Sequence, residues 1–278
     1  MSLTGIIEPG NRHDLRFGLS PDAPDENDLD GSSEGAGAFG YVHSYESASR
    51  YDGPGLRVVL FTSGCLLRCV YCHNPDTWHL KDGTRVSAQH VIDRLGDFAS
   101  ALRALGGGLT ISGGEPMVQL EFTRRIFQGA KRMGLHTAIE TSGNLGERAD
   151  KAYLQAIDLV LLDIKSGNPE TYKAVTGREL QPTLRFAERL AAIGKPAWVR
   201  FTLVPGVTDD PENVERIARF GAPMKNVDWV EIQPFHQLGS FKWKALGLDY
   251  PMASGAAPSP VIVERVRDQF RSAGCRVR

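Results

Sequence analysis

The sequence lacks the features of an exported or membrane-spanning protein. Residues Met1–Gly10 carry neither a basic start nor a long apolar run, so we expect no secretory signal. Nowhere do the 278 residues contain the roughly 20 consecutive apolar residues that cross a bilayer. We therefore expect a cytoplasmic protein that does not bind a membrane.

Cysteine is scarce, and the net charge is close to zero. Four cysteines in 278 residues do not make a disulfide framework, and three of them lie within eight residues, which indicates metal binding in a reducing compartment. The formal net charge of −1 gives no reason to expect nucleic acid as a partner. Hydrophobic residues make up 41% of the chain, which is enough for a sizeable core.

The acidic residues are unevenly distributed. Residues 1–40 carry a net charge of −6, and the stretch Ser20–Gly40 has almost no large apolar side chain. Such a segment cannot bury enough surface to offset its ordering entropy, so we predict that residues 1–40 form a disordered acidic tail. Residues 41–278, with a net charge of +5, form the second predicted unit, a single folded domain.

Beyond Tyr41, short apolar runs alternate with segments of helical spacing. This alternation predicts an α/β fold with a parallel sheet, and six repeats predict a partial (β/α)6 TIM-type barrel. The predicted strands are Leu56–Thr62, Gly108–Ser112, His136–Glu140, Leu159–Asp163, Ala197–Val204 and Val227–Pro234. The predicted helices are Ser87–Leu105, Leu120–Met133, Asp150–Ala156, Pro169–Val175, Pro182–Ile193, Pro211–Gly221 and Ser259–Ala273.

Polar groups follow five of these strands. In α/β barrels the active site lies at the carboxyl ends of the strands, so we expect these groups to meet there rather than only to cap helices. They are Ser112–Glu115, Glu140–Thr141, Asp163 with Lys165, Arg200, and Gln233–His236.

The three clustered cysteines, Cys65, Cys69 and Cys72, follow the first predicted strand of the barrel. Thiolates are ligands for zinc and for iron–sulfur clusters. Zinc would need His73 as a fourth ligand, and adjacent Cys72 and His73 would have difficulty reaching one ion. Covalent haem would match Cys69–His73 but would ignore Cys65 and require export. We favour a [4Fe–4S] cluster with three protein thiolates and one open iron; distant Cys275 is expected to be structural.

The Cys-x3-Cys-x2-Cys spacing resembles the signature of the radical S-adenosylmethionine superfamily. Further motifs resemble, in order and spacing, the glycyl-radical activating enzymes of that superfamily, the pyruvate formate-lyase activating family in particular, from about residue 41 to residue 278. These motifs are Tyr51–Arg57, Tyr71–Asn74, Ser112–Glu115, Leu162–Lys165, Val204–Gly206 and Pro234–Gly239.

The resemblance implies a radical S-adenosylmethionine fold, one [4Fe–4S] cluster on Cys65, Cys69 and Cys72, and reductive cleavage of S-adenosylmethionine to a 5′-deoxyadenosyl radical. It also implies contacts to S-adenosylmethionine from Tyr71, Cys72, His73, Gly113, Gly114, Glu115, Asp163, Ile164, Lys165 and His236. Asp52 and Arg57 are expected near the opening through which a target peptide enters. Glu140 stands where the family often has Asp, which puts any small-ion or ribose role of this position in doubt.

The implied reaction removes a hydrogen from a glycine of pyruvate formate-lyase, with flavodoxin or ferredoxin as electron donor and the activase as a monomer. Some relatives carry a ferredoxin-like insertion; between Cys72 and Gly113 this chain has no cysteine, which favours the simple activase. Two alternatives stay open. One is an activase of another glycyl-radical enzyme, such as anaerobic ribonucleotide reductase. The other is a non-catalytic iron–sulfur or zinc protein.

Overall fold

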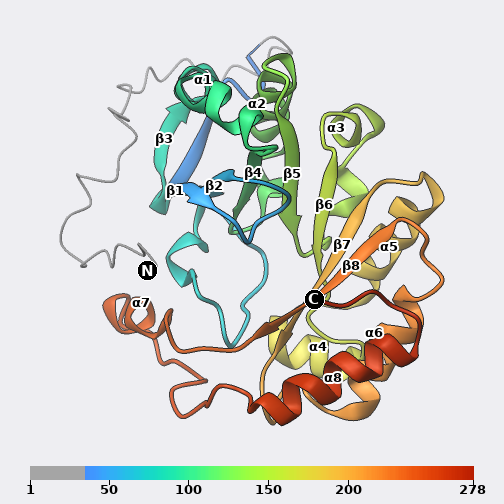
Figure 1. Ribbon diagram of the computed structural model, residues 1–278. Coiled ribbons are helices and arrows are strands. Elements are labelled where there is room, and N and C mark those ends of the chain that lie inside the picture. Colours follow the sequence, from blue (N-terminus) through green and yellow to red (C-terminus); the bar gives the residue numbers. More distant parts are fainter. Residues whose placement is uncertain (1–34) are drawn as a thin grey trace.

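The computed structural model describes residues 35–278, and its strands form one curved eight-stranded sheet (Figure 1). The strand order is β3-β1-β2-β4-β5-β6-β7-β8. The strands are β1 (Phe39–Ser49), β2 (Arg57–Thr62), β3 (Thr84–Ser87), β4 (Gly108–Gly113), β5 (His136–Thr141), β6 (Leu159–Asp163), β7 (Ala197–Leu203) and β8 (Val227–Pro234).

The six strands from β2 to β8 that pair in parallel are the six predicted from the sequence. The prediction of a partial α/β barrel is therefore confirmed. Two strands were not predicted: β1 pairs antiparallel with both β2 and β3 at one edge of the sheet. The eleven residues of β1 mix polar and apolar side chains, and β3 has only four residues, so neither shows the continuous apolar run of a doubly covered strand.

The helices follow the parallel strands, as the alternation predicted. They are α1 (Ala88–Ala104), α2 (Leu120–Arg132), α3 (Lys151–Gln155), α4 (Pro169–Thr176), α5 (Gln181–Ala192), α6 (Pro211–Gly221), α7 (Ser240–Ala245) and α8 (Pro260–Ser272). The predicted helix starts are confirmed at Ser87 and Asp210, whose side chains accept hydrogen bonds from the N–H groups of His90 and Asn213. The six-residue helix α7 was not predicted.

Alternation along each strand separates two apolar layers. The outer face packs under the helices, with Leu162 of β6 and Phe201 of β7 in the main core. The inner face holds a second, smaller group at the amino-terminal half of the strands, made of Ala138, Leu159, Leu161 and Trp198 with Trp229 against them. Because strand side chains alternate, the residues two positions further along share this inner face.

Residues 35–40, which were predicted to belong to the tail, are part of the described fold. Phe39 and Gly40 belong to β1, and the carbonyl of Ala36 accepts a hydrogen bond of 2.8 Å from Arg125 of α2. Residues 1–34 of the predicted tail lie outside the described part of the chain. Among residues 35–278, no helix combines the length and the apolar character needed to span a bilayer.

Candidate active site

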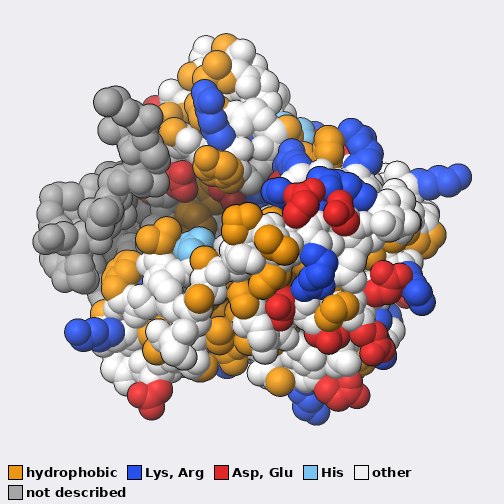
Figure 2. All heavy atoms as spheres, turned by 60° about the horizontal axis from the view of Figure 1, so that its bottom comes forward, with side chains coloured by type: hydrophobic (Ala, Val, Ile, Leu, Met, Phe, Trp, Pro, Cys, Tyr) orange, Lys and Arg blue, Asp and Glu red, His pale blue; other side chains and the backbone are white. Residues whose placement is uncertain are grey.

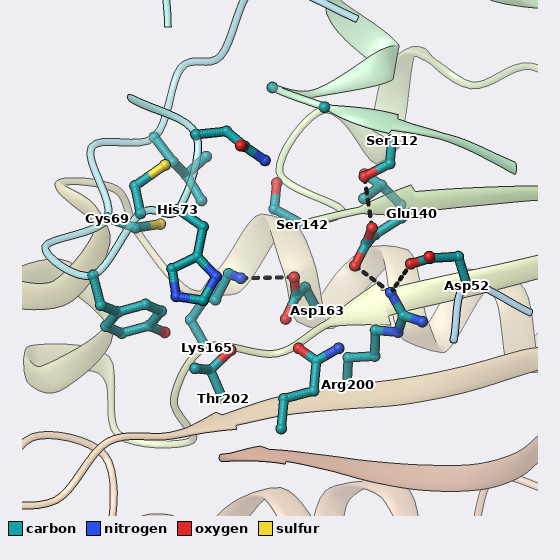
Figure 3. A pocket seen from close by; sticks show the side chains of 18 of the residues that line it. Asp52, Cys69, His73, Ser112, Glu140, Ser142, Asp163, Lys165, Arg200 and Thr202 are labelled. Atoms are coloured by element: carbon teal, nitrogen blue, oxygen red, sulfur yellow. Dashed lines mark hydrogen bonds and ion pairs between the residues drawn. The ribbon is translucent and has the colours of Figure 1, made fainter. Parts of the chain in front are cut away.

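The polar residues at the carboxyl ends of the strands line one cavity of about 710 Å³ (Figure 3). Four of them follow an inner-face apolar residue by two positions: Glu140 follows Ala138, Asp163 follows Leu161, Arg200 follows Trp198, and Glu231 follows Trp229. The strand-end residues in the lining are Ser112, Gly113, Glu140, Thr141, Asp163, Arg200, Thr202, Glu231, Ile232, Gln233 and Pro234. The predicted convergence of strand ends is therefore confirmed.

Cys65, Cys69 and Cys72 lie on the loop after β2 and all three line this cavity. Backbone hydrogen bonds fix the loop on both sides: the N–H of Cys65 donates to Trp78 (3.0 Å), and that of Val70 donates to Val175 at the end of α4 (3.0 Å). From α7, the indole N–H of Trp243 donates to the carbonyl of Cys72 (2.8 Å). The loop is thus held by contacts that span 105 residues, from Val70 to Val175, and 171 residues, from Cys72 to Trp243.

The three sulfurs suit a soft metal centre. Burial raises the pKa of the Cys65 and Cys69 thiols to about 12 and also raises that of Cys72, so deprotonation needs a compensating positive charge such as iron. The backbone N–H groups of Leu67 and Asn74 favour the thiolate forms of Cys65 and Cys72, but burial outweighs them and the pKa values stay raised. The donor set therefore fits a cluster held by three cysteines.

His73 does not complete a zinc site with these cysteines. Its ring stacks on the ring of His236, with centroids 4.2 Å apart, and its Nε2 lies 3.1 Å from the carbonyl oxygen of His236. Burial and the neighbouring His236 lower the pKa of His73 to about 4, and burial lowers the pKa of His236, so both lining imidazoles favour the neutral form. Neutral stacked rings present a flat apolar surface to a ligand.

Asp163 and Lys165 form an ion pair of 2.6 Å in the middle of the cavity wall. Burial opposes the charge on Lys165, but the carboxylate of Asp163 outweighs it and raises the pKa of the ammonium well above its usual value. The second carboxylate oxygen of Asp163 is buried without a hydrogen-bond partner in the described part of the chain, as is the hydroxyl of Tyr71. Buried polar atoms of this kind require a ligand or water, so the wall is built to receive a polar molecule.

Arg200 forms the neighbouring part of the wall, since it is the register partner of Asp163 on the adjacent strand β7 (Figure 3). Its side chain is 2% exposed and lies among three carboxylates, Asp52, Glu140 and Glu231. Burial and the nearby Glu140 raise the pKa of Asp52, whereas the Arg200 guanidinium outweighs burial and lowers that of Glu140. Glu140 also accepts a hydrogen bond of 2.6 Å from Ser112. The longer carboxylate at this position is thus held by Ser112 and Arg200.

Most of the predicted ligand contacts lie in the cavity lining, but Glu115 and Ile164 do not. Glu115 is fully buried, and its two oxygens accept hydrogen bonds from Thr141 (2.7 Å) and from the hydroxyl (2.7 Å) and N–H (3.0 Å) of Ser142. Its side chain therefore supports the strand ends from behind. Gly113 and Gly114 do line the cavity, but packing alone requires glycine there, since a Cβ would lie 2.3 Å from Thr62 and 2.4 Å from Gly64 backbone atoms.

Asp52 and Arg57 were both expected near the opening, but only Asp52 lines the cavity. Asp52 lines the cavity beside Arg200, whereas Arg57 is fully buried and donates to Thr110 Oγ1 (3.0 Å) and to the carbonyl of Leu109. Cys275 lies outside the cavity lining, with its sulfur 3.8 Å from the carbonyl of Ala218, in agreement with the expected structural role.

Sequence reasoning missed several lining residues. Arg200 was noted only as a strand end, and Thr202, Glu231 and Arg278 were not singled out. The period of two along β7 and β8 could have found Thr202 and Glu231, since they continue the inner-face rows that start at Trp198 and Trp229. Arg278 has no local signal.

Comparisons with known proteins give one consistent family. The model of the radical SAM superfamily matches residues 59–220. The chain is 40% identical over 232 residues to the pyruvate formate-lyase-activating enzyme of Listeria monocytogenes, covering 81% of this chain and 93% of the relative. It is 39% identical over 239 residues to that of Staphylococcus epidermidis, covering 84% and 94%.

Solved structures agree on the fold. A domain of pyruvate-formate lyase-activating enzyme from Bacteroides vulgatus superposes with a TM-score of 0.51 at 22% identity, covering 62% of this chain and 98% of that one. Streptococcus suis SuiB bound to S-adenosylmethionine superposes with a TM-score of 0.57 at 13% identity, covering 79% of this chain and 50% of that one. At these identities the likeness shows a shared fold.

Proposed function

The chain belongs to the radical SAM superfamily and, within it, to the pyruvate formate-lyase-activating enzymes, and on this premise we propose that it generates a glycyl radical on pyruvate formate-lyase. A [4Fe–4S] cluster and S-adenosylmethionine are its cofactors. The observation that carries the proposal is that one cavity joins the three cysteines, the Asp163–Lys165 pair and the Arg200 wall.

Cys65, Cys69 and Cys72 would hold the cluster. When bound, it supplies the electron that cleaves a C–S bond of S-adenosylmethionine, which gives methionine and a 5′-deoxyadenosyl radical. The protein contributes the placement of the reactants. The loop contacts from Trp78, Val175 and Trp243 hold the three sulfurs before any metal arrives, which lowers the entropic cost of assembly.

The central wall would bind S-adenosylmethionine through complementary polar groups. The ammonium of Lys165 suits a carboxylate, and the unpartnered oxygen of Asp163 suits a hydroxyl or an ammonium. The neutral rings of His73 and His236, with Tyr71 beside them, offer flat surfaces for an adenine. At this strand end the N–H groups of Gly114 and Glu115 donate to the carbonyl oxygens of Thr62 and Gly64. Because an ammonium only donates hydrogen bonds, a ligand ammonium would bind to carbonyl oxygens here.

The partner would dock on the face that carries the cysteine loop and α7, and its glycine segment would reach through the cavity to Arg200. Figure 2 views the molecule from the bottom of Figure 1, where the cysteine loop, α4 and α7 lie, and hydrophobic side chains gather across this face. Leu66, Leu238 and Phe241 are among the exposed large apolar residues, at 40%, 75% and 48% exposure. Exposed apolar residues next to a cavity are typical of a surface that docks another protein.

A partner of the glycyl-radical class follows from the family. Pyruvate formate-lyase is favoured over anaerobic ribonucleotide reductase because curated relatives that share 93–94% of their length with this chain are named for the former. We further propose a cytoplasmic monomer reduced by flavodoxin or ferredoxin. Four free thiols support a reducing compartment. The charge of +5 on residues 41–278 suits an acidic donor.

The test compares the two partners directly. The reconstituted and reduced enzyme is incubated with S-adenosylmethionine and either pyruvate formate-lyase or anaerobic ribonucleotide reductase from the same cell. Electron paramagnetic resonance should show a carbon-centred radical, split by the glycine α-hydrogen, on pyruvate formate-lyase. Formation of methionine and 5′-deoxyadenosine with a radical only on the reductase would reassign the partner, and the absence of cleavage would refute the proposed chemistry.

A further inference from the structure

Residues 276–278 extend the sheet along β8, at the edge opposite β3. The N–H of Val230 donates to Arg276 (2.8 Å), that of Arg278 donates to Val230 (3.0 Å), and that of Ile232 donates to Arg278 (3.2 Å). Val277 and Val230 form a parallel bridge. Because strand side chains alternate, Arg276 and Arg278 share a face, and they lie over Trp229 (4.1 Å) and Trp198 (3.9 Å) respectively.

The two arginines differ in their carboxylate partners. The Nε of Arg278 lies 2.8 Å from Oε1 of Glu231, and its terminal NH2 group contacts the same oxygen. Arg276 is paired with no carboxylate among residues 35–278. The other oxygen of Glu231, Oε2, accepts a hydrogen bond of 2.8 Å from the Nε of Arg200. Glu231 therefore bridges an arginine at the sheet edge and the buried arginine of the cavity wall.

The charges around Arg200 explain why the second arginine matters. Asp52, Glu140 and Glu231 surround a single guanidinium that is 2% exposed. Arg278 adds a second positive charge, and it fixes the carboxylate of Glu231, which is 13% exposed, in one rotamer. Without Arg278, Glu231 would have one unpaired oxygen and could rotate toward solvent, and Arg200 would lose its Nε partner.

We propose that Arg278 is a positioning residue: through Glu231 it fixes Arg200 in the cavity wall, and thereby the surface on which the partner's glycine segment is held. This inference rests on the proposed function, since it concerns the fate of the radical rather than its formation. Arg278 itself lines the cavity at its edge, where an incoming segment would pass. Loss of Arg278 should weaken the binding and activation of pyruvate formate-lyase more than the binding of S-adenosylmethionine.

The experiment uses Arg278→Met with Arg276→Met as matched control. Both keep an aliphatic stem over a tryptophan, and only the first removes an ion pair. In the reconstituted enzyme, R278M should raise the KM for pyruvate formate-lyase about fivefold, the scale of a partly exposed ion pair, and should increase the 5′-deoxyadenosine formed per glycyl radical. The Kd of S-adenosylmethionine should change less. R276M should match the wild type in all three quantities.

A double-mutant cycle tests the route through Glu231. If Arg278 acts through this carboxylate, the double variant E231Q/R278M should have the same KM for pyruvate formate-lyase as E231Q alone. R278K, which keeps the positive charge, should have a KM between those of R278M and the wild type. Iron content and Tm confirm that each variant is folded and loaded. Equal behaviour of R278M and R276M, or full additivity with E231Q, would overturn the inference. A wild type that yields no glycyl radical would refute the proposed function instead.

Discussion

The Asp163–Lys165 pair illustrates how single residues make this cavity. Both charges are largely buried, and a buried charge is tolerated only where it is paired. One oxygen of Asp163 stays unpartnered within residues 35–278, which leaves a strong acceptor pointing at the cavity. A pair that served only the fold would have no need of a free acceptor, so the residue pattern favours ligand binding.

Replacing Lys165 by Ala should weaken the binding of S-adenosylmethionine by roughly 10- to 100-fold, because a charge-assisted hydrogen bond worth about 1.5–3 kcal/mol is lost. Lys131→Ala is the control, since it removes a lysine paired with Asp158 outside the cavity. Calorimetry on the reconstituted proteins measures both affinities. An unchanged affinity in K165A, or an equal loss in K131A, would remove Lys165 from the site.

His136 should make stability depend on pH. Burial and the adjacent Arg57 lower its pKa from 6.5 to about 4, and its Nδ1 lies 3.1 Å from the Arg57 guanidinium. Between these pKa values the unfolded chain binds a proton that the folded chain does not, so the free energy of unfolding falls as pH drops from 6.5 to 4.

His136→Gln keeps a hydrogen-bond acceptor but does not titrate. Denaturant unfolding between pH 7.5 and 4 should give a slope shallower than that of the wild type by at most about 1.4 kcal/mol per pH unit. His79→Gln is the comparison, since that side chain is exposed. Identical slopes for H136Q and the wild type would contradict the assignment.

At the scale of elements, the loop that carries Cys65, Cys69 and Cys72 is held both by elements that could be predicted from the sequence and by elements that could not. The six parallel strands were predictable because strands buried on both faces, such as β6, are continuously apolar. The helix α7 and the strands β1 and β3 were not, because their places are set by tertiary contacts such as Trp243 to Cys72. Likewise, nothing local distinguishes Glu115, which supports Ser142, from a ligand contact.

The three cysteines of the loop should be individually required for the metal centre. Anaerobically reconstituted protein should contain about four iron and four sulfide per chain. Substituting Cys65, Cys69 or Cys72 by Ala should abolish this content, whereas Cys275→Ala, outside the cavity, should retain it. Iron and sulfide analysis gives the result. Stoichiometric zinc without sulfide in protein kept free of oxygen would contradict the cluster.

At the scale of the whole molecule, residues 35–278 by themselves bring the three cysteines, the Asp163–Lys165 pair and Arg200 into one cavity. Removing residues 1–34 should therefore leave cleavage of S-adenosylmethionine within about twofold of the full chain, because their acidic, apolar-poor composition gives them no core to join. The deletion ends before Ala36, so it keeps the hydrogen bond that the carbonyl of Ala36 accepts from Arg125. Loss of cleavage in a folded and iron-loaded truncate would show that the segment contributes to the site.

The central claim is that the cluster on three cysteines and S-adenosylmethionine share one cavity. The most direct measurement is the electron paramagnetic resonance spectrum of the reduced, reconstituted protein with and without S-adenosylmethionine. A cluster with one iron not bound by the protein should give a [4Fe–4S]⁺ signal whose line shape changes when the ligand is added, and K165A should require a higher concentration for the same change. A signal that stays the same at saturating S-adenosylmethionine would contradict the claim.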